Sequence, residues 1–154
     1  MHRSTVEISG SEILNVVRSV FSEPLEESNI ELEATLSFRG FMVKCKSSAV
    51  MGAFINVIDN AIYWLNSRSQ RQKKIVLDAD HEGFLISNNG PGIDQRVRQR
   101  IFDFGETQKP GGRGMGLAIS QQTLRREGFD IELVQSGIDV NPQFKIFSKE
   151  LGDE

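Results

Sequence analysis

Hydrophobic residues near the start of the chain recur at helical spacing. The apolar positions within 11–23 are Ile13, Leu14, Val16, Val17, Val20 and Phe21. Ser9 precedes them and Glu12 follows three residues later, which is the spacing of a capping box that satisfies the first backbone N–H groups of a helix. The pattern predicts a helix over 11–23, closed by Pro24 because proline has no N–H to donate.

Alternating apolar and polar residues mark the next segments. Residues 30–36 alternate as a strand with one buried face does, and residues 41–45 alternate again. Arg39-Gly40, between them, has the composition of a turn. We therefore expect these two strands to pair as an antiparallel hairpin. Residues 5–9 are expected to form a short edge strand.

The second half of the chain contains four more strand-like segments. They predict strands over 75–79, 84–87, 131–134 and 144–147. A tight turn at His81-Glu82-Gly83 joins the first two, and a longer turn over 136–142 joins the last two. Because His81 lies in a turn, we expect it at the surface and without a catalytic role.

Two long helices complete the pattern. Residues 48–66 predict a central helix with Ser47 or Ser48 as its cap, and residues 115–127 predict a last helix that Gly128 ends. Together the elements predict an α/β (α+β) two-layer sandwich. Its sheet would be mixed, mainly antiparallel and of about five strands, with three main helices on one face.

Length and composition fit a single domain over residues 1–154. The chain has 154 residues, of which 38% are hydrophobic and 25% charged, and its longest apolar runs fall short of the roughly 20 residues that cross a bilayer. Cys45 is the only cysteine, so an internal disulfide is excluded, and its alternation with Phe41 and Val43 predicts a buried strand position. The default expectation is a cytoplasmic protein without membrane contact.

The charge pattern does not favour nucleic acid as a partner. The formal net charge is −3. Residues 66–74 are locally basic, with Arg68, Arg71, Lys73 and Lys74, but no aromatic side chains are interleaved there to stack on bases. A solvated linker is the preferred interpretation of this segment.

Polar residues form one stripe on the otherwise apolar central helix. Asn56, Asp59, Asn60 and Tyr63 stand at offsets of zero, three, four and seven, which places them on one helical face. Such a stripe is costly to bury unless hydrogen bonds or a ligand satisfy it. On its own the stripe fits two interpretations. The amides either tie the helix to neighbouring backbone or bind a metal with phosphate oxygens.

Two glycine-rich segments follow the central helix. The segment 88–93, Asn-Asn-Gly-Pro-Gly-Ile, comes directly after a predicted strand, and its glycines let the backbone approach a ligand closely because they lack a Cβ. After a short basic helix over 94–100, the stretch 105–116 holds five glycines together with Lys109 and Arg113. It leads into the last helix, whose free N–H groups and dipole favour phosphate.

Four segments occur in a fixed order along the chain. They are the helix at Asn56 to Asn60, the glycine pair Gly90 and Gly92, the Phe-x-Phe at 102–104, and Gly-Arg-Gly-Met-Gly-Leu at 112–117. Together they resemble the ATP-binding catalytic domain of sensor histidine kinases, a histidine kinase-like ATPase of the GHKL superfamily with the Bergerat fold. The resemblance covers roughly residues 5–148 and implies an ATP site with a flexible lid.

The resemblance implies roles for the polar stripe. Asn60 would coordinate Mg²⁺, which bridges the phosphates of ATP, and Asn56 would lie beside it as a nucleotide-binding and catalytic residue. Hydrolysing members of the superfamily usually carry a glutamate at the position of Asn56 to activate water, whereas an amide cannot accept a proton as a general base. Asn56 therefore resembles the histidine kinase branch, in which a histidine from another domain is the nucleophile.

The resemblance also implies the contacts to the base. Gly90 and Gly92 would line the adenine pocket, with Ile93 packing nearby. Phe102 and Phe104 resemble the aromatic box that anchors the base of the lid. Two phenylalanines at this spacing also suit plain core or hinge packing, so their contribution to binding could be indirect.

The phosphate contacts are expected from the lid and from the start of the last helix. The positions implied by the resemblance are Thr107, Lys109, Gly112, Arg113, Gly114, Met115, Gly116 and Leu117. Lys109 would meet the terminal phosphates and Arg113 would lie in the same loop, and both would act as catalytic cations.

Three features depart from the family pattern. Asn88 replaces the aspartate that reads adenine; its carbonyl can still accept a hydrogen bond, but without the charge-assisted component, so weaker discrimination of ATP over GTP is expected. Tyr63, retained as a nucleotide-binding candidate, replaces a basic residue. His2 and His81 are the only histidines, so the dimerisation and phosphoacceptor domain is expected elsewhere in the parent protein or in trans.

Two functions are compatible with the sequence. The leading one is Mg–ATP binding and donation of the γ-phosphate to a histidine outside the chain. The alternative is a non-kinase ATPase or an ATP-dependent conformational switch of a larger protein. Asn56 favours the first function, whereas the missing histidine domain leaves room for the second. A domain that binds no nucleotide disagrees with the intact Asn60 and glycines.

Overall fold

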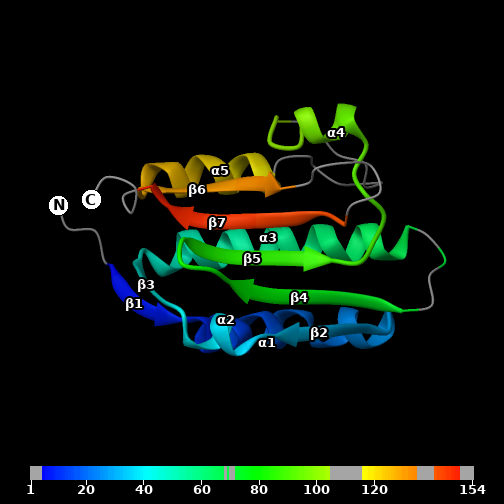
Figure 1. Cartoon of the computed structure of the whole chain (residues 1–154), viewed down its shortest axis with the longest axis horizontal. Helices are drawn as coiled ribbons and strands as arrows, with labels where there is room; N and C mark the ends of the chain where they lie inside the picture. The colour runs from blue at the N-terminus through cyan, green and yellow to red at the C-terminus, as the bar shows by residue number, and fades with distance from the viewer. Residues whose placement is uncertain (1–4, 68, 70–71, 105–115, 135–140, 150–154) are drawn as a thin grey trace.

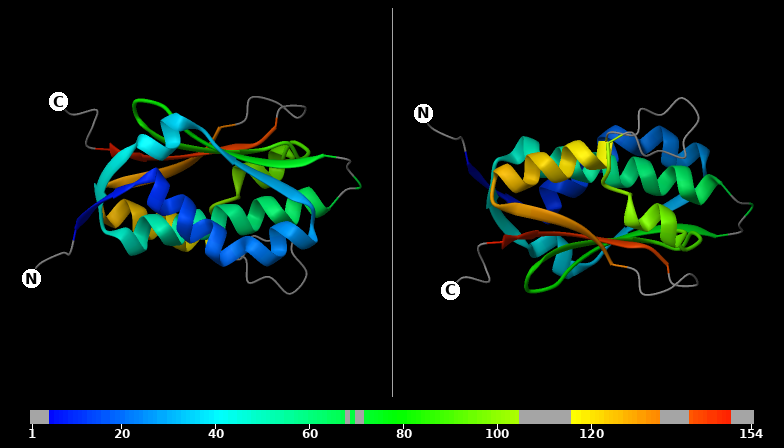
Figure 2. Two further views of the ribbon diagram at one scale, coloured as in Figure 1. Left: turned by 90° about the horizontal axis from the view of Figure 1, so that it is seen from below. Right: turned by 90° about the horizontal axis from the view of Figure 1, so that it is seen from above.

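The computed structural model describes residues 5–67, 69, 72–104, 116–134 and 141–149. Its elements follow the order β1 (Val6–Ser9), α1 (Gly10–Glu27), β2 (Ile30–Ala34), α2 (Leu36–Gly40), β3 (Met42–Cys45), α3 (Ser47–Asn66), β4 (Lys73–Ala79), β5 (Gly83–Asn88), α4 (Gln95–Gln99), α5 (Gly116–Arg126), β6 (Phe129–Val134) and β7 (Gln143–Ser148) (Figure 1). Helices α1, α3 and α5 lie on one face of the main sheet (Figure 2). The two-layer α/β sandwich expected from the sequence is confirmed.

The main sheet has five strands in the order β2-β4-β5-β7-β6. β2 runs parallel to β4 and the other neighbouring pairs are antiparallel, which confirms a mixed, mainly antiparallel sheet. The predicted turn at 81–83 joins β4 to β5, with Leu77 opposite Ile86. β5 and β6 follow one another as strands of this sheet along the chain, with β7 between them in space. The segment from Asn89 to the end of α5 connects them and is therefore an insertion between two strands of one sheet.

The prediction of a hairpin between residues 30–36 and 41–45 is wrong. β2 pairs with β4 in the main sheet, whereas β3 pairs with β1 in a separate antiparallel ribbon. Helix α2 stands in place of the turn at Arg39-Gly40, and the Thr35 hydroxyl caps it by accepting from the N–H of Phe38 at 3.1 Å. The Phe38 side chain is fully buried. A helix replaces the turn because this arrangement brings an aromatic ring into the core.

The first helix extends beyond its predicted end. The capping box of Ser9 and Glu12 is present as expected, but α1 continues through Pro24 to Glu27. Pro24 and Val20, whose carbonyl would have bonded the missing N–H, are both exposed to solvent. Water can satisfy that carbonyl, and the helix therefore tolerates the proline.

The central helix is capped differently from the prediction. α3 begins at Ser47 with Lys46 as its N-cap residue, and no side-chain hydrogen bond caps it, so neither Ser47 nor Ser48 acts as the cap. The helix starts early because β3 ends at Cys45, which leaves Lys46 alone to connect the two elements. The predicted burial of Cys45 is confirmed, and burial raises the pKa of its thiol to about 11.

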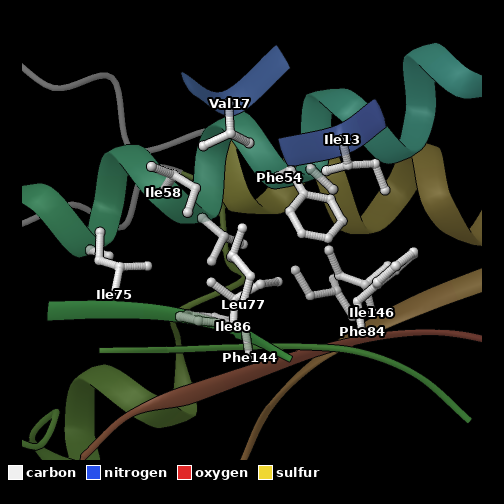
Figure 3. Close-up of a cluster of buried hydrophobic side chains, with 14 of the residues drawn as sticks. Ile13, Val17, Phe54, Ile58, Ile75, Leu77, Phe84, Ile86, Phe144 and Ile146 are labelled. Carbon is white, nitrogen blue, oxygen red and sulfur yellow. The ribbon is translucent and has the colours of Figure 1, made fainter. Parts of the chain in front are cut away.

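The core lies between the sheet and the helices. Figure 3 shows side chains from α1, such as Ile13, and from α3, such as Ile58, pointing toward those of the sheet. Neighbouring rings meet edge-on or tilted at centroid distances of 4.9 to 5.9 Å; the four rings are Phe38, Phe41, Phe54 and Phe84. This cluster joins α2 and α3 to β5.

α3 supplies much of this core. Its buried positions recur along its whole length, from Ala49 to Leu65. Among the described helices, it is the one whose length and apolar composition would also suit a membrane crossing. Because α3 packs against α1, α5 and β5, its role as the central helix of a folded domain accounts for that composition.

Asp80 stabilises the turn between β4 and β5. Its Oδ1 accepts from the N–H groups of Glu82 at 2.8 Å and Gly83 at 3.1 Å, and its Oδ2 lies 3.4 Å from Lys145 Nζ. Burial alone would raise the pKa of Asp80, but the two N–H groups and Lys145 together hold this pKa below its usual value. A carboxyl whose pKa falls on folding stabilises the fold above its usual pKa, and the contribution is lost as the pH drops.

We expect Asp80→Ala to lower the free energy of unfolding by about 1 kcal/mol at pH 7, since water partly screens the ion pair. The loss should shrink as the pH falls below about 4, the usual pKa of an aspartate, because the lowered pKa makes the folded carboxyl take up its proton only at still lower pH. Urea unfolding at several pH values measures both effects. Glu23→Ala removes an exposed carboxyl of α1 and should change little. An equal loss for Asp80→Ala at every pH would contradict the electrostatic explanation.

Candidate functional site

Helix α3 supports both groups of candidate residues. Asn56 and Asn60 lie one helical turn apart, and Leu65 follows near the C-terminal end of the helix. Asn56 contacts the start of α5, whereas Leu65 lies beside Gly90 after β5. The rise of an α-helix separates Asn56 from Leu65 by about 14 Å along its axis. The same rigid element therefore spans the candidate phosphate end and the candidate base end of the site.

Asn56 ties α3 to the first turn of α5. Its Nδ2 donates to the carbonyl oxygen of Gly116 at 2.9 Å and to the hydroxyl of Ser120 at 2.6 Å. A Cβ added at Gly116 would lie 3.2 Å from Asn56 Oδ1, a close contact that glycine avoids. Asn56 thus fits the first interpretation of the polar stripe, an amide that links the helix to neighbouring backbone.

Asn60 fits the second interpretation. Its side chain is half-buried, and within the part of the chain that the structure describes it makes no hydrogen bond. The amide oxygen is therefore available to a ligand, and a neutral oxygen is a suitable donor for Mg²⁺. Asp59, its neighbour in the stripe, is exposed, and the Tyr63 ring packs edge-on against Trp64 at 5.3 Å.

The donor set suits Mg²⁺ held mainly by a substrate. No group of three or more His, Cys, Asp or Glu side chains among the described residues could hold a metal ion. Mg²⁺ commonly takes one or two protein ligands and completes its shell with phosphate oxygens and water. A single amide oxygen from Asn60 is compatible with that mode of binding, and a protein-only metal cage is not expected here.

Asn88 and Gly90 form a tight turn at the end of β5. Asn88 Oδ1 accepts from the N–H of Gly90 at 2.8 Å. A Cβ on Gly90 would lie 2.8 Å from that oxygen and 3.3 Å from Leu65 Cδ2, so the site admits only glycine without rearrangement. Asn141 donates from Nδ2 to the Gly90 carbonyl at 2.9 Å. These contacts hold the first glycine segment against α3, and Gly92 follows it half-buried.

The two phenylalanines of the Phe-x-Phe differ in environment. Phe102 is half-buried and packs edge-on against Phe144 of β7 at 6.2 Å, whereas Phe104 is 61% exposed. Both line a shallow hollow beside α5. Phe102 therefore fits the core-packing interpretation. The buried side chains of Ile93 and Leu117 likewise belong to the core beside the site.

Six predicted site residues lie outside the described residues. They are Thr107, Lys109, Gly112, Arg113, Gly114 and Met115. The proposed lid and its two cations therefore stay predictions. Gly116 is the first residue of α5. Hydrogen bonds join Asn56 to Gly116 and Asn88 to Gly90, two pairs of predicted residues within the described part of the chain.

Sequence reasoning missed two polar partners in the site. Ser120 is buried and shares a face of α5 with Leu117 and Leu124, so its position as a polar residue in an apolar stripe was a usable signal. Asn141 lies outside any helix or strand, and its contact with Gly90 joins residues 51 positions apart. No local pattern points to such a contact.

Residues 45–149 match the family described as histidine kinase-, DNA gyrase B-, and HSP90-like ATPase. The autoinducer 1 sensor kinase/phosphatase LuxN of Vibrio campbellii is 37% identical over 95 residues, which are 60% of this chain and 11% of LuxN. The signal transduction histidine-protein kinase AtoS of Escherichia coli is 31% identical over 80 residues, which are 51% of this chain and 13% of AtoS. The chain thus spans only a small part of the length of these relatives.

A solved structure has the same fold. The catalytic domain of histidine kinase ThkA superposes with a TM-score of 0.75 and covers 95% of this chain and 96% of its own. The sequence identity is 22%, so this likeness concerns the fold alone. It agrees with the two-layer arrangement in which three helices cover one face of a mixed sheet.

Proposed function

Because this chain belongs to the family of histidine kinase-, DNA gyrase B- and HSP90-like ATPases, we propose that it binds Mg–ATP and donates the γ-phosphate to a histidine outside the chain. The observation that carries the proposal is the environment of Asn56. Its amide nitrogen donates to Gly116 and Ser120, and an amide has no proton-accepting role in water activation. A site without a base at this position favours transfer to an external nucleophile over hydrolysis.

The residues divide the work of binding. The amide oxygen of Asn60 would hold Mg²⁺, which when bound neutralises charge on the phosphates. The first N–H groups of α5 favour the phosphates, and Asn56 keeps this helix in position against α3. Lys109 and Arg113 would add positive charge at the terminal phosphates. Phosphoryl transfer depends mainly on such positioning and charge neutralisation.

The base would bind at the other end of α3. Gly92 is half-buried and has no Cβ to keep a flat ring from the backbone, whereas Gly90 packs against Asn88 and the fully buried Leu65 and thereby fixes the turn beside it. Ile93 is the further candidate at this end, and Tyr63 stays a nucleotide-binding candidate at a position where the family pattern has a basic residue. The proposed partner is a histidine-containing dimerisation and phosphoacceptor domain, supplied by the parent protein or in trans. The proposed location is the cytoplasm, where ATP is available.

The alternative function is a non-kinase ATPase or an ATP-dependent conformational switch. The observation that favours it is the placement of the histidines. His81 lies exposed in the turn between β4 and β5 and is not part of a helix, and His2 is outside the described residues. In this alternative, a change at the start of α5 on nucleotide binding would be transmitted to α3 through the hydrogen bonds that Asn56 makes to Gly116 and Ser120.

Labelling distinguishes the two functions. We expect the full-length parent protein to become labelled when it is incubated with Mg²⁺ and ATP labelled at the γ-phosphate. The label should be lost in acid and retained in base, because phosphohistidine is acid-labile and base-stable. The Asn60→Ala variant should acquire none. Release of inorganic phosphate without labelled protein would contradict the kinase proposal and support the ATPase alternative.

A further inference from the structure

Asn88 places an amide on the helix-facing side of the sheet. It alternates with Phe84 and Ile86, which are 1% and 2% exposed and belong to the core, and is itself 7% exposed. Among the described residues, Asn88 and Ser120 are the polar side chains buried to this degree. The hydroxyl of Ser120 pairs with Asn56. The amide of Asn88 is paired at only one of its two ends.

The paired end fixes the orientation of the amide. The N–H of Gly90 is buried and needs an acceptor, which Oδ1 provides at 2.8 Å and an NH₂ group cannot. Nδ2 therefore occupies the other end of the side chain. Within the described residues Nδ2 has no hydrogen-bond partner, and the residue keeps 7% of its surface exposed, so Nδ2 is the polar end of Asn88 that is left for a ligand. Its two hydrogens demand acceptors.

The 6-position of a purine decides which base suits a donor. Adenine carries an amino group there, which donates, whereas guanine and hypoxanthine carry a carbonyl oxygen, which accepts. An aspartate at the position of Asn88 offers only acceptors and suits adenine. The free end of Asn88 is a donor and suits the carbonyl. Adenine can still pair through its N1 or through the second lone pair of Oδ1, so ATP is not excluded.

We propose that Asn88 contacts the base as a hydrogen-bond donor and that the site takes 6-oxopurine nucleoside triphosphates at least as well as ATP. This inference rests on the proposed function, because it requires a nucleotide whose base lies beside Asn88 and Gly90. It goes further by naming the class of base. Inosine triphosphate is the sharper probe, since hypoxanthine has the 6-carbonyl without the 2-amino group of guanine.

Calorimetry with Mg²⁺ and each nucleotide tests the proposal. We expect the unmodified chain to bind inosine triphosphate at least as tightly as ATP. Asn88→Asp should reverse this order and favour ATP by about tenfold, because the carboxylate accepts from both the adenine amino group and the Gly90 N–H. The side chains are nearly equal in size, and thermal unfolding should confirm that the variant folds.

Asn89→Asp is the matched control. Asn89 is exposed, and its side chain accepts from the N–H of Lys74 in β4 and donates to the carbonyl of Gln72, so the same chemical change there should leave the ratio of affinities unaltered. Tighter binding of ATP than of inosine triphosphate in the unmodified chain would overturn the inference and leave the proposed function intact. Failure to bind any of these nucleotides would overturn both.

Discussion

Replacing Asn60 with alanine is expected to abolish Mg–ATP binding and leave the fold unchanged. The amide of Asn60 is half-buried and makes no hydrogen bond to the described residues, so its removal leaves no protein group unpaired. The proposed contact to Mg²⁺ would be lost entirely. A polar contact to a charged group contributes up to about 3 kcal/mol, which is about a hundredfold in affinity, and loss of Mg²⁺ would also remove the charge neutralisation at the phosphates, so we expect the affinity to fall by about a hundredfold or more.

Calorimetry measures the affinity, and circular dichroism with urea unfolding checks the fold. Asn66→Ala is the matched control, because Asn66 lies on the same helix but is exposed and pairs with Ser28 and Lys73. Its affinity for Mg–ATP should equal that of the unmodified chain. An Asn60→Ala variant that keeps its affinity would exclude Asn60 as the metal ligand.

Gly10→Ala is expected to destabilise the fold by about 3 kcal/mol or more. Gly10 opens α1, and its N–H donates to the carbonyl of Phe41 at 2.9 Å. A Cβ added there would overlap the backbone carbonyl of Phe38. Because the obstacle is backbone and not a flexible side chain, α1 and α2 would have to separate, and the fully buried ring of Phe38 would move with them.

Gly52→Ala is the control for this change. Gly52 lies inside α3, and a Cβ added there meets nothing within 4 Å, so alanine should stabilise the helix by about 0.5 to 1 kcal/mol. Urea unfolding measures both variants. If α1 packs on α2 as described, the free energy of unfolding should fall for Gly10→Ala and rise for Gly52→Ala. A neutral Gly10→Ala would contradict the close packing of α1 on α2.

Local patterns explain what the sequence predicted correctly. The capping box at Ser9 and the tight turn at 81–83 involve neighbouring residues, so their side chains alone specify them. The pairing partner of a strand, in contrast, is not specified by neighbouring residues. Alternation in 30–36 indicates a buried face but not which strand lies beside it, and the contact of Phe38 with Phe54 that favours α2 depends on the folded chain.

The candidate site divides in the same way. Asn60 and Gly90 were predicted because their residue types and order follow a family pattern. The orientation of the Asn88 amide could not be predicted, since it follows from the buried N–H of Gly90. The tie from Asn56 to Ser120 spans 64 positions and needed the packing of α3 against α5 to become visible.

The parallel pairing of β2 with β4 affects how the chain folds. Ile30 lies opposite Lys73 and Ala34 opposite Leu77, so each contact of the pair joins residues 43 positions apart. Closing so long a loop costs more entropy than forming the hairpin of β4 and β5. Until β2 arrives, the edge of β4 is open to strands of other molecules. β2 then covers this edge of β4, and its own outer edge carries Glu31 and Glu33, charged side chains that oppose pairing with a strand of another molecule.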